Sequence, residues 1–193
     1  MLKDGRVEFL RPEAVCHTSA MTWSRGKIAG LLFMVGGALS LIASIAGAVG
    51  SAPGAWLGLV GLLLEGVAFV LFGLGFARAR TRAWVPWLFV IAGALMIVMA
   101  LLWMVGGGLG AATRLVQLAI VALIVVAAVL LLSARSIDSI LAIALIVLGA
   151  LLAITLFVGN VVIGVLIGAA YILVGLLVWG VRFGRSGSGA RRG

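Results

Sequence analysis

The chain has 193 residues, of which 65% are hydrophobic and only 10% are charged, and its mean hydropathy is +1.37. A soluble domain of this length could not bury so much apolar surface, so the composition excludes a soluble globular protein and predicts an all-α polytopic membrane protein. The formal net charge of +9 would suit nucleic-acid binding. The basic residues flank the apolar segments instead of forming one patch, so we expect no nucleic-acid partner.

The first 26 residues form a polar segment that differs from the rest of the chain. We expect residues 1–26 to be a cytoplasmic tail, with disorder as one alternative. Translation from Met1 and from Met21 are both open, because the residues after Met21 are typical of the start of a membrane protein. Cys16 and His17 are each the only residue of their type. Two ligands cannot complete a four-ligand site, so we predict no metal and no cofactor.

Six apolar stretches of about 20 residues follow, each long enough to cross a hydrocarbon core of about 30 Å as a helix. Lipid offers no hydrogen-bond partner to the backbone, so these segments must be helical. The links between them are short, and consecutive helices are therefore antiparallel. We predict one transmembrane domain over 27–183 and a basic Gly/Ser/Arg tail over 184–193. The stretches are 28–49, 55–77, 84–105, 113–133, 137–158 and 160–181.

The tripeptide Gly-Ala-Leu occurs three times, beginning at Gly37, Gly93 and Gly149, at a constant interval of 56 residues. Each copy lies in an apolar stretch that is followed by a second one, which is typical of a tandem repeat of two-helix hairpins. An even number of helices in each unit gives all units the same orientation in the membrane. The sequence therefore predicts three parallel hairpin repeats. They cover 28–77, 84–133 and 137–181.

The basic residues lie almost entirely on one side of this predicted topology. Of the 14 Lys and Arg residues, only Arg114 belongs to the other side. This is the positive-inside pattern, so we expect a multi-pass protein of the plasma (inner) membrane with both termini in the cytoplasm. Anionic lipid headgroups at the cytoplasmic face are the expected partners of these residues. The basic residues on that side are Lys3, Arg6, Arg11, Arg25, Lys27, Arg78, Arg80, Arg82, Arg135, Arg182, Arg185, Arg191 and Arg192.

Two of the predicted helices carry small residues along one face, at the spacing i, i+4, i+7 and i+11. Such stripes let helix backbones approach closely in lipid, and we interpret them as helix-packing faces. The similar triplets Leu59-Val60-Gly61 and Leu166-Ile167-Gly168 align these two helices with each other. The first stripe consists of Gly54, Gly58, Gly61 and Glu65, and the second of Gly164, Gly168, Tyr171 and Gly175.

Glu65 is the acidic residue that lies well inside a predicted span, where a charged carboxylate costs about 2.5 to 3.5 kcal/mol. It is either a proton- or cation-binding carboxyl or a neutral structural acid hydrogen-bonded across a helix interface. The corresponding positions in the other repeats are Val121 and Ile172, so we expect no three-fold ion site. The other polar candidates of the bundle, too scattered to outline a pocket, are Gln117, Asn160 and Tyr171.

The apolar stretch over 161–176, the three Gly-Ala-Leu segments and the Trp-Val-Pro-Trp motif at 84–87 are the most distinctive parts of the chain. In these segments, and in its three tandem hairpins, the chain resembles the HdeD-type family of small six-helix bacterial membrane proteins. The resemblance implies a role in acid or envelope stress and supplies no catalytic residues.

No catalytic motif is present in the sequence, and we expect a non-enzymatic membrane protein that supports stress tolerance or acts as a scaffold. The first alternative is a transport component, such as a six-helix substrate-capture subunit. The second is an accessory subunit of a larger membrane complex. A homo-oligomer is equally open, since nothing in the sequence specifies a partner.

Overall fold

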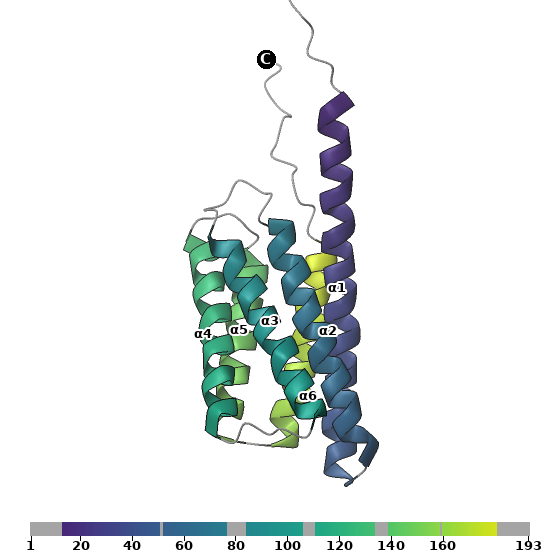
Figure 1. Ribbon diagram of the computed structural model, residues 1–193, viewed down its shortest axis with the longest axis vertical. Coiled ribbons are helices and arrows are strands. Elements are labelled where there is room, and N and C mark those ends of the chain that lie inside the picture. The colour runs from purple at the N-terminus through teal and green to yellow at the C-terminus, as the bar shows by residue number, and fades with distance from the viewer. Residues whose placement is uncertain are drawn as a thin grey trace, which may run out of the picture.

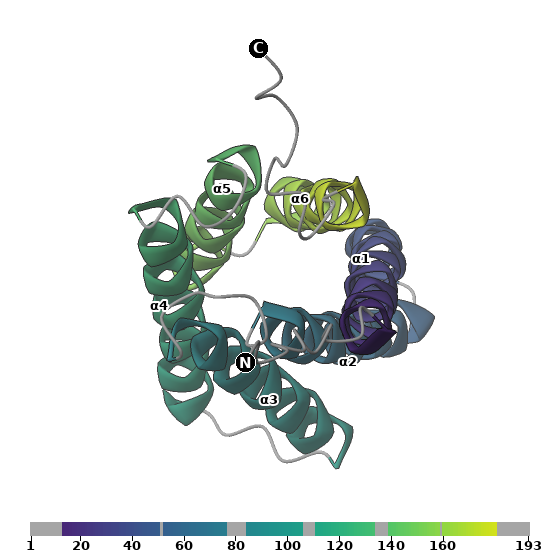
Figure 2. The same ribbon diagram turned by 90° about the horizontal axis from the view of Figure 1, so that it is seen from above.

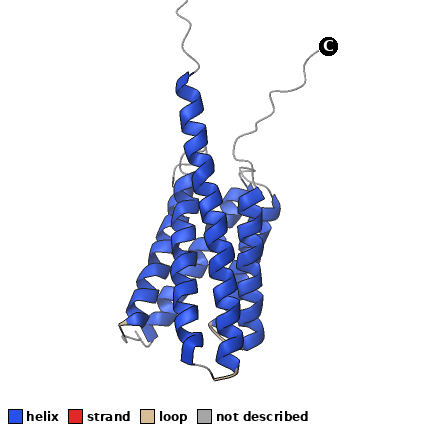
Figure 3. Ribbon diagram, turned by 90° about the vertical axis from the view of Figure 1, so that its right-hand side faces the viewer, coloured by secondary structure: helices blue, strands red, loops and turns tan. Residues whose placement is uncertain are grey.

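The computed structural model describes residues 13–50, 52–76, 84–105, 111–133, 139–158 and 160–180. Within these ranges the chain is α-helical apart from short turns (Figure 3). The predicted basic tail over 184–193 and the first 12 residues lie outside the described residues. The helices are α1 (Glu13–Ala48), α2 (Ala52–Phe76), α3 (Val85–Met104), α4 (Ala111–Ser133), α5 (Ser139–Thr155) and α6 (Val161–Gly180).

The six helices stand side by side in a ring (Figures 1 and 2). Each helix packs against the next one in the chain, and α6 closes the ring by packing against α1. The first and last helices are therefore neighbours, although more than a hundred residues separate them in the sequence. Consecutive helices run in opposite directions, as the short links require.

Five of the helices are long and apolar enough to cross a membrane, namely α2, α3, α4, α6 and the Gly26–Ala48 part of α1. Helix α5 has 17 residues and is about 26 Å long, at the lower limit for a span. It is shorter than the predicted stretch over 137–158. The helix ends where Thr155 Oγ1 donates a hydrogen bond to the Leu152 carbonyl oxygen, 2.7 Å away, and a turn follows at Leu156 and Phe157.

Helix α1 differs most from its expected bounds. It has 36 residues and begins at Glu13, whereas the apolar pattern predicts a helix from residue 28. The expected polar tail over 1–26 thus includes helical residues from Glu13 onward, because the helix continues into it without a break. Its first turns project beyond the ring (Figure 1).

The core of the bundle is one continuous cluster that receives buried side chains from all six helices. Aromatic rings from α1, α2, α3 and α6 form part of it. Phe33 packs edge-on against Phe69 with ring centroids 4.8 Å apart, and Phe72 packs edge-on against Phe89 at 5.1 Å. Edge-to-face pairs of this kind add about 0.5–1.5 kcal/mol to the effect of burial.

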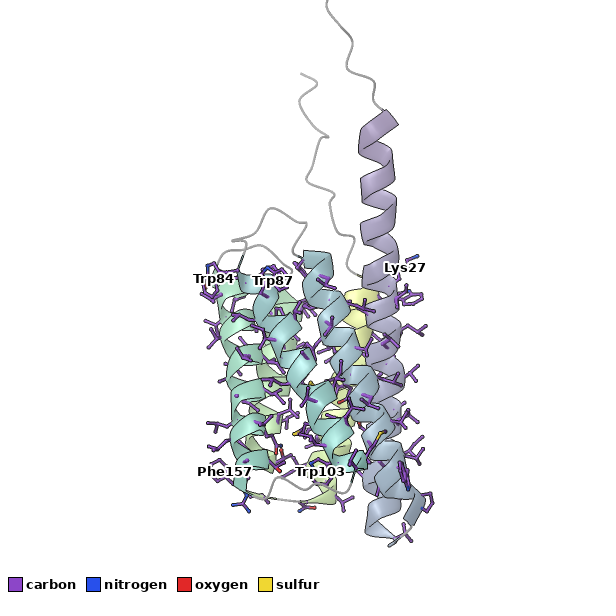
Figure 4. The ribbon with its side chains drawn as sticks, viewed as in Figure 1. Lys27, Trp84, Trp87, Trp103 and Phe157 are labelled. Atoms are coloured by element: carbon purple, nitrogen blue, oxygen red, sulfur yellow. The ribbon has the colours of Figure 1, made fainter. Side chains whose placement is uncertain are left out.

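The outer surface of the ring carries exposed aliphatic side chains along every helix, as expected for a surface that faces lipid. Large aromatic side chains mark both ends of the bundle (Figure 4). Trp84 and Trp87 lie at the same end as Lys27, while Trp103 and Phe157 lie at the opposite end. Tryptophan rings favour the two membrane–water interfaces, so the placement of Trp84, Trp87 and Trp103 is as expected for a bundle that spans a membrane.

Glycines set the closest helix contacts. A Cβ atom added to Gly37 of α1 would lie 2.7 Å from the Gly168 carbonyl oxygen of α6. Gly93 of α3 approaches the backbone of α2 at Gly66 in the same way. In both contacts, backbone meets backbone, and a larger residue could not be accommodated by rotating a side chain.

Candidate functional site

The candidate site centres on Glu65, which is the one charged side chain that is buried among the described residues, with 3% of its surface exposed. Its Oε1 atom accepts a hydrogen bond of 2.7 Å from Ser40 Oγ of α1. Gly36, one turn before Ser40, gives the carboxyl room, since a Cβ atom there would lie 2.9 Å from Glu65 Cγ. The small face of α1 is thus what admits an acidic side chain into this interface.

Tyr171 of α6 approaches the same carboxyl from the other side of α1. Its side chain is 1% exposed, and its hydroxyl lies close enough to interact electrostatically with Glu65. The hydroxyl has no partner in good hydrogen-bonding geometry. The Tyr171 ring stacks on Phe33 with centroids 6.2 Å apart and meets Phe69 edge-on at 6.3 Å. Two aromatic contacts therefore hold this hydroxyl beside Glu65.

No cation among the described residues balances Glu65. The Gly26–Ala48 part of α1 contains one ionisable residue, Lys27, and α3 contains none. Lys27 precedes Ser40 by 13 residues, which is about 20 Å along a helix, and its Nζ lies 5.7 Å from the Trp179 ring centroid. Glu65 is therefore surrounded by hydroxyls and apolar groups.

The glycines of the α2 stripe face α1. A Cβ atom on Gly61 would lie 2.7 Å from Ser40 Oγ and 3.1 Å from the Gly36 carbonyl oxygen. At Gly54 it would lie 3.1 Å from Ala46 Cβ, and at Gly58 it would meet Ala43 Cβ at an ordinary 3.5 Å. The contact is therefore closest at Gly61, the glycine of the stripe that lies nearest to Glu65.

The glycines of the α6 stripe also face α1, on its other side. A Cβ atom would lie 2.7 Å from the Gly37 carbonyl oxygen if added to Gly168. It would lie 2.7 Å from the Gly30 carbonyl oxygen if added to Gly175. Gly164 abuts the Ser44 side chain. Helix α1 thus packs between the small-residue faces of α2 and α6. The Glu65 cluster, which consists of Glu65, Ser40 and Tyr171, lies where these three helices meet.

The remaining polar candidates lie apart from this cluster. Gln117 Nε2 donates a hydrogen bond of 3.0 Å to Thr155 Oγ1, which joins the start of α4 to the end of α5. Asn160 is exposed, and its Oδ1 accepts a hydrogen bond of 3.1 Å from the Val162 N–H, so it caps α6. Of the predicted polar candidates, only Tyr171 is brought to Glu65.

Sequence reasoning missed Ser40 as a partner of Glu65. Ser40 lies on the same small face of α1 as Gly36, and this spacing was the available signal. Within the described ranges, no group of three or more His, Cys, Asp or Glu residues is placed to hold a metal ion. Comparison of the chain with family models, with curated proteins and with solved structures gives no match.

Proposed function

We propose that this protein is a non-enzymatic, HdeD-like protein of a bacterial plasma (inner) membrane that supports membrane or acid stress tolerance, or acts as a membrane scaffold. One observation carries the proposal. The inside of the ring is packed with aromatic and aliphatic side chains from all six helices, as in a structural bundle. A transport component would need a polar path near the midplane, and the Glu65 cluster is the feature that favours this alternative.

We further propose that the ring consists of three equivalent hairpins and that the short helix α5 also crosses the membrane. The pattern of buried residues on α1, α3 and α5 supports the repeat, because it recurs at the interval of 56. Gly37, Gly93 and Gly149 each contact the preceding helix of the ring, at Gly168, Gly66 and Val125. The buried sets are Ala29, Val85 and Leu141, then Phe33, Phe89 and Leu145.

These glycine contacts support an alignment of α2, α4 and α6 that differs from the one indicated by the triplets ending at Gly61 and Gly168. Gly66 contacts Gly93 as Gly168 contacts Gly37, so Gly66, and not Gly61, is the counterpart of Gly168. In this register the residues equivalent to Glu65 are Ile124 and Ile167, both buried, in place of Val121 and Ile172. The α5–α6 hairpin is then the shortest, because Gly168 follows Gly149 by 19 residues, whereas Gly66 follows Gly37 by 29 and Val125 follows Gly93 by 32.

The orientation is also a proposal, supported by the distribution of the basic residues between the two sides. Reporter fusions after Arg82, after Arg135 and at the C-terminus are expected to give cytoplasmic signals. Fusions near Gly54 and Gly108 are expected to give external signals, because positively charged loops are retained inside. A cytoplasmic signal at Gly108 would contradict the three-hairpin arrangement.

The proposed stress role is tested by comparing the survival of cells with and without the gene after an acid challenge and after a membrane-disrupting challenge. We expect lower survival without the gene and restoration by the wild-type chain. Equal survival under both challenges would contradict the stress role. The transport alternative predicts a bound solute that copurifies with the protein in mild detergent, whereas the accessory-subunit alternative predicts a stoichiometric protein.

A further inference from the structure

We propose that Glu65, Ser40 and Tyr171 form a binding site for one exchangeable proton at the junction of α1, α2 and α6. In the occupied site, Ser40 Oγ donates to Oε1 of Glu65, and the proton on the second carboxyl oxygen is donated to the Tyr171 hydroxyl. The proton thereby links α2 to α6, the helix that closes the ring. The proposal does not depend on the stress role, since it concerns the chemistry of the cluster alone.

The geometry shows that the Glu65 carboxyl is one part of a site formed by side chains from three helices. The carboxyl and the tyrosine ring are both almost fully buried, and each is fixed by neighbours on a different helix. Ser40 donates to one carboxyl oxygen at 2.7 Å, while the Tyr171 hydroxyl lies beside the carboxyl and has no partner in good hydrogen-bonding geometry. A buried hydroxyl that makes no hydrogen bond costs about 1–3 kcal/mol. A proton on the second oxygen of Glu65 lets the carboxyl donate a hydrogen bond to this hydroxyl.

The cluster is confined to one of the three sectors of the ring. In the proposed repeat register, Ile124 and Ile167 stand at the position of Glu65, and Met96 and Leu152 at the position of Ser40. Phe69 and Ala128 correspond to Tyr171. At the positions equivalent to Glu65, Ser40 and Tyr171, the two other sectors thus carry apolar side chains, so the fold does not require polar groups at these positions.

A proton fits this site better than a metal cation. Hard cations such as Ca²⁺ take six to eight oxygen ligands, whereas the side chains of this cluster offer four oxygen atoms. Backbone carbonyls in the surrounding helices are already engaged in the helix. Among the described residues, Tyr171 is the ionisable group that faces Glu65. Helix α1 contributes Ser40 and Gly36 to this contact, and α3 contains no ionisable residue. A single proton neutralises the carboxyl without any further ligand.

The test is infrared spectroscopy of the full-length protein in lipid bilayers. At neutral pH we expect a carbonyl stretching band from a protonated carboxyl, absent in Glu65→Gln. The comparison with Glu65→Gln separates this band from any contribution of the other acidic residues, which lie outside the proposed spans and are Asp4, Glu8, Glu13 and Asp138. Ser40→Ala should move the band to higher frequency, because the carboxyl carbonyl loses its hydrogen bond. The band should disappear in alkaline buffer and return at neutral pH.

Circular dichroism is the control for folding. Tyr171→Phe is the matched conservative variant, because phenylalanine occupies the equivalent position of another sector, at Phe69. If Glu65→Gln does not fold, the band shifts in Ser40→Ala and Tyr171→Phe carry the assignment. Absence of the band in folded wild-type protein at neutral pH would overturn the proposal. A band that survives alkaline buffer would show a permanent structural acid, and one abolished by Na⁺ at constant pH would show a cation site. Either result would also overturn the proposal.

Discussion

Gly37→Leu and Gly168→Leu are each expected to lower the melting temperature of the bundle far more than Gly75→Leu. The first two changes force a side chain into a contact where a Cβ atom alone would lie 2.7 Å from a backbone carbonyl oxygen of the facing helix. Overpacking of a core typically costs about 1–3 kcal/mol. We expect the upper end of this range or more, because a backbone cannot give way as a side chain can.

Gly75 of α2 is the matched control, since a Cβ atom there meets nothing within 4 Å. Melting in one detergent, followed by circular dichroism, compares the three variants under identical conditions. Gly149→Ala provides an intermediate case, because its nearest obstacle is the side chain of Val125 at 2.5 Å, which has some freedom to move. Equal melting temperatures for all four proteins would show that these glycines do not set the helix contacts.

Much of the fold follows from the sequence because lipid imposes a simple rule. Apolar stretches separated by short polar links must be helices with antiparallel neighbours, and six helices are observed at the predicted places. The sequence predicts the ends of the helices less well. Glu13 to Lys27 extends α1 although these residues carry no apolar pattern. Helix α5 stops at Thr155, in a turn at Leu156 and Phe157, before its apolar run ends.

The candidate site was predictable as separate residues but not as a cluster. Glu65 and Tyr171 each stand out because a polar group within a span is costly. Their meeting depends on the closure of the ring by α6 against α1, a contact between helices distant in the sequence. Periodicity describes one helix at a time and cannot indicate which two faces meet. Ser40 was overlooked for the same reason, since serine is also an ordinary small packing residue.

Glu65→Ile is expected to destabilise the bundle, and Tyr171→Phe in the same chain is expected to restore part of the loss. Isoleucine fits the space, because Ile124 and Ile167 occupy the proposed equivalent positions. The cost arises because the half-buried hydroxyl of Ser40 and the buried hydroxyl of Tyr171 both lose the carboxyl. One stranded buried hydroxyl costs about 1–3 kcal/mol, while replacing both partners of a polar pair by apolar groups can be nearly neutral.

A double-mutant cycle measures this coupling through the unfolding free energies of wild-type, Glu65→Ile, Tyr171→Phe and the double variant. Residues in contact typically show interaction energies of about 0.5–3 kcal/mol, and we expect a value in this range. Tyr171→Phe alone should cost less than Glu65→Ile, because the carboxyl keeps its bond to Ser40. Strictly additive effects would show that the Tyr171 hydroxyl does not engage Glu65. The closure of the ring would then rest on the glycine contacts and the Phe33–Tyr171 stacking between α1 and α6, and the proton would have no role in joining α2 to α6.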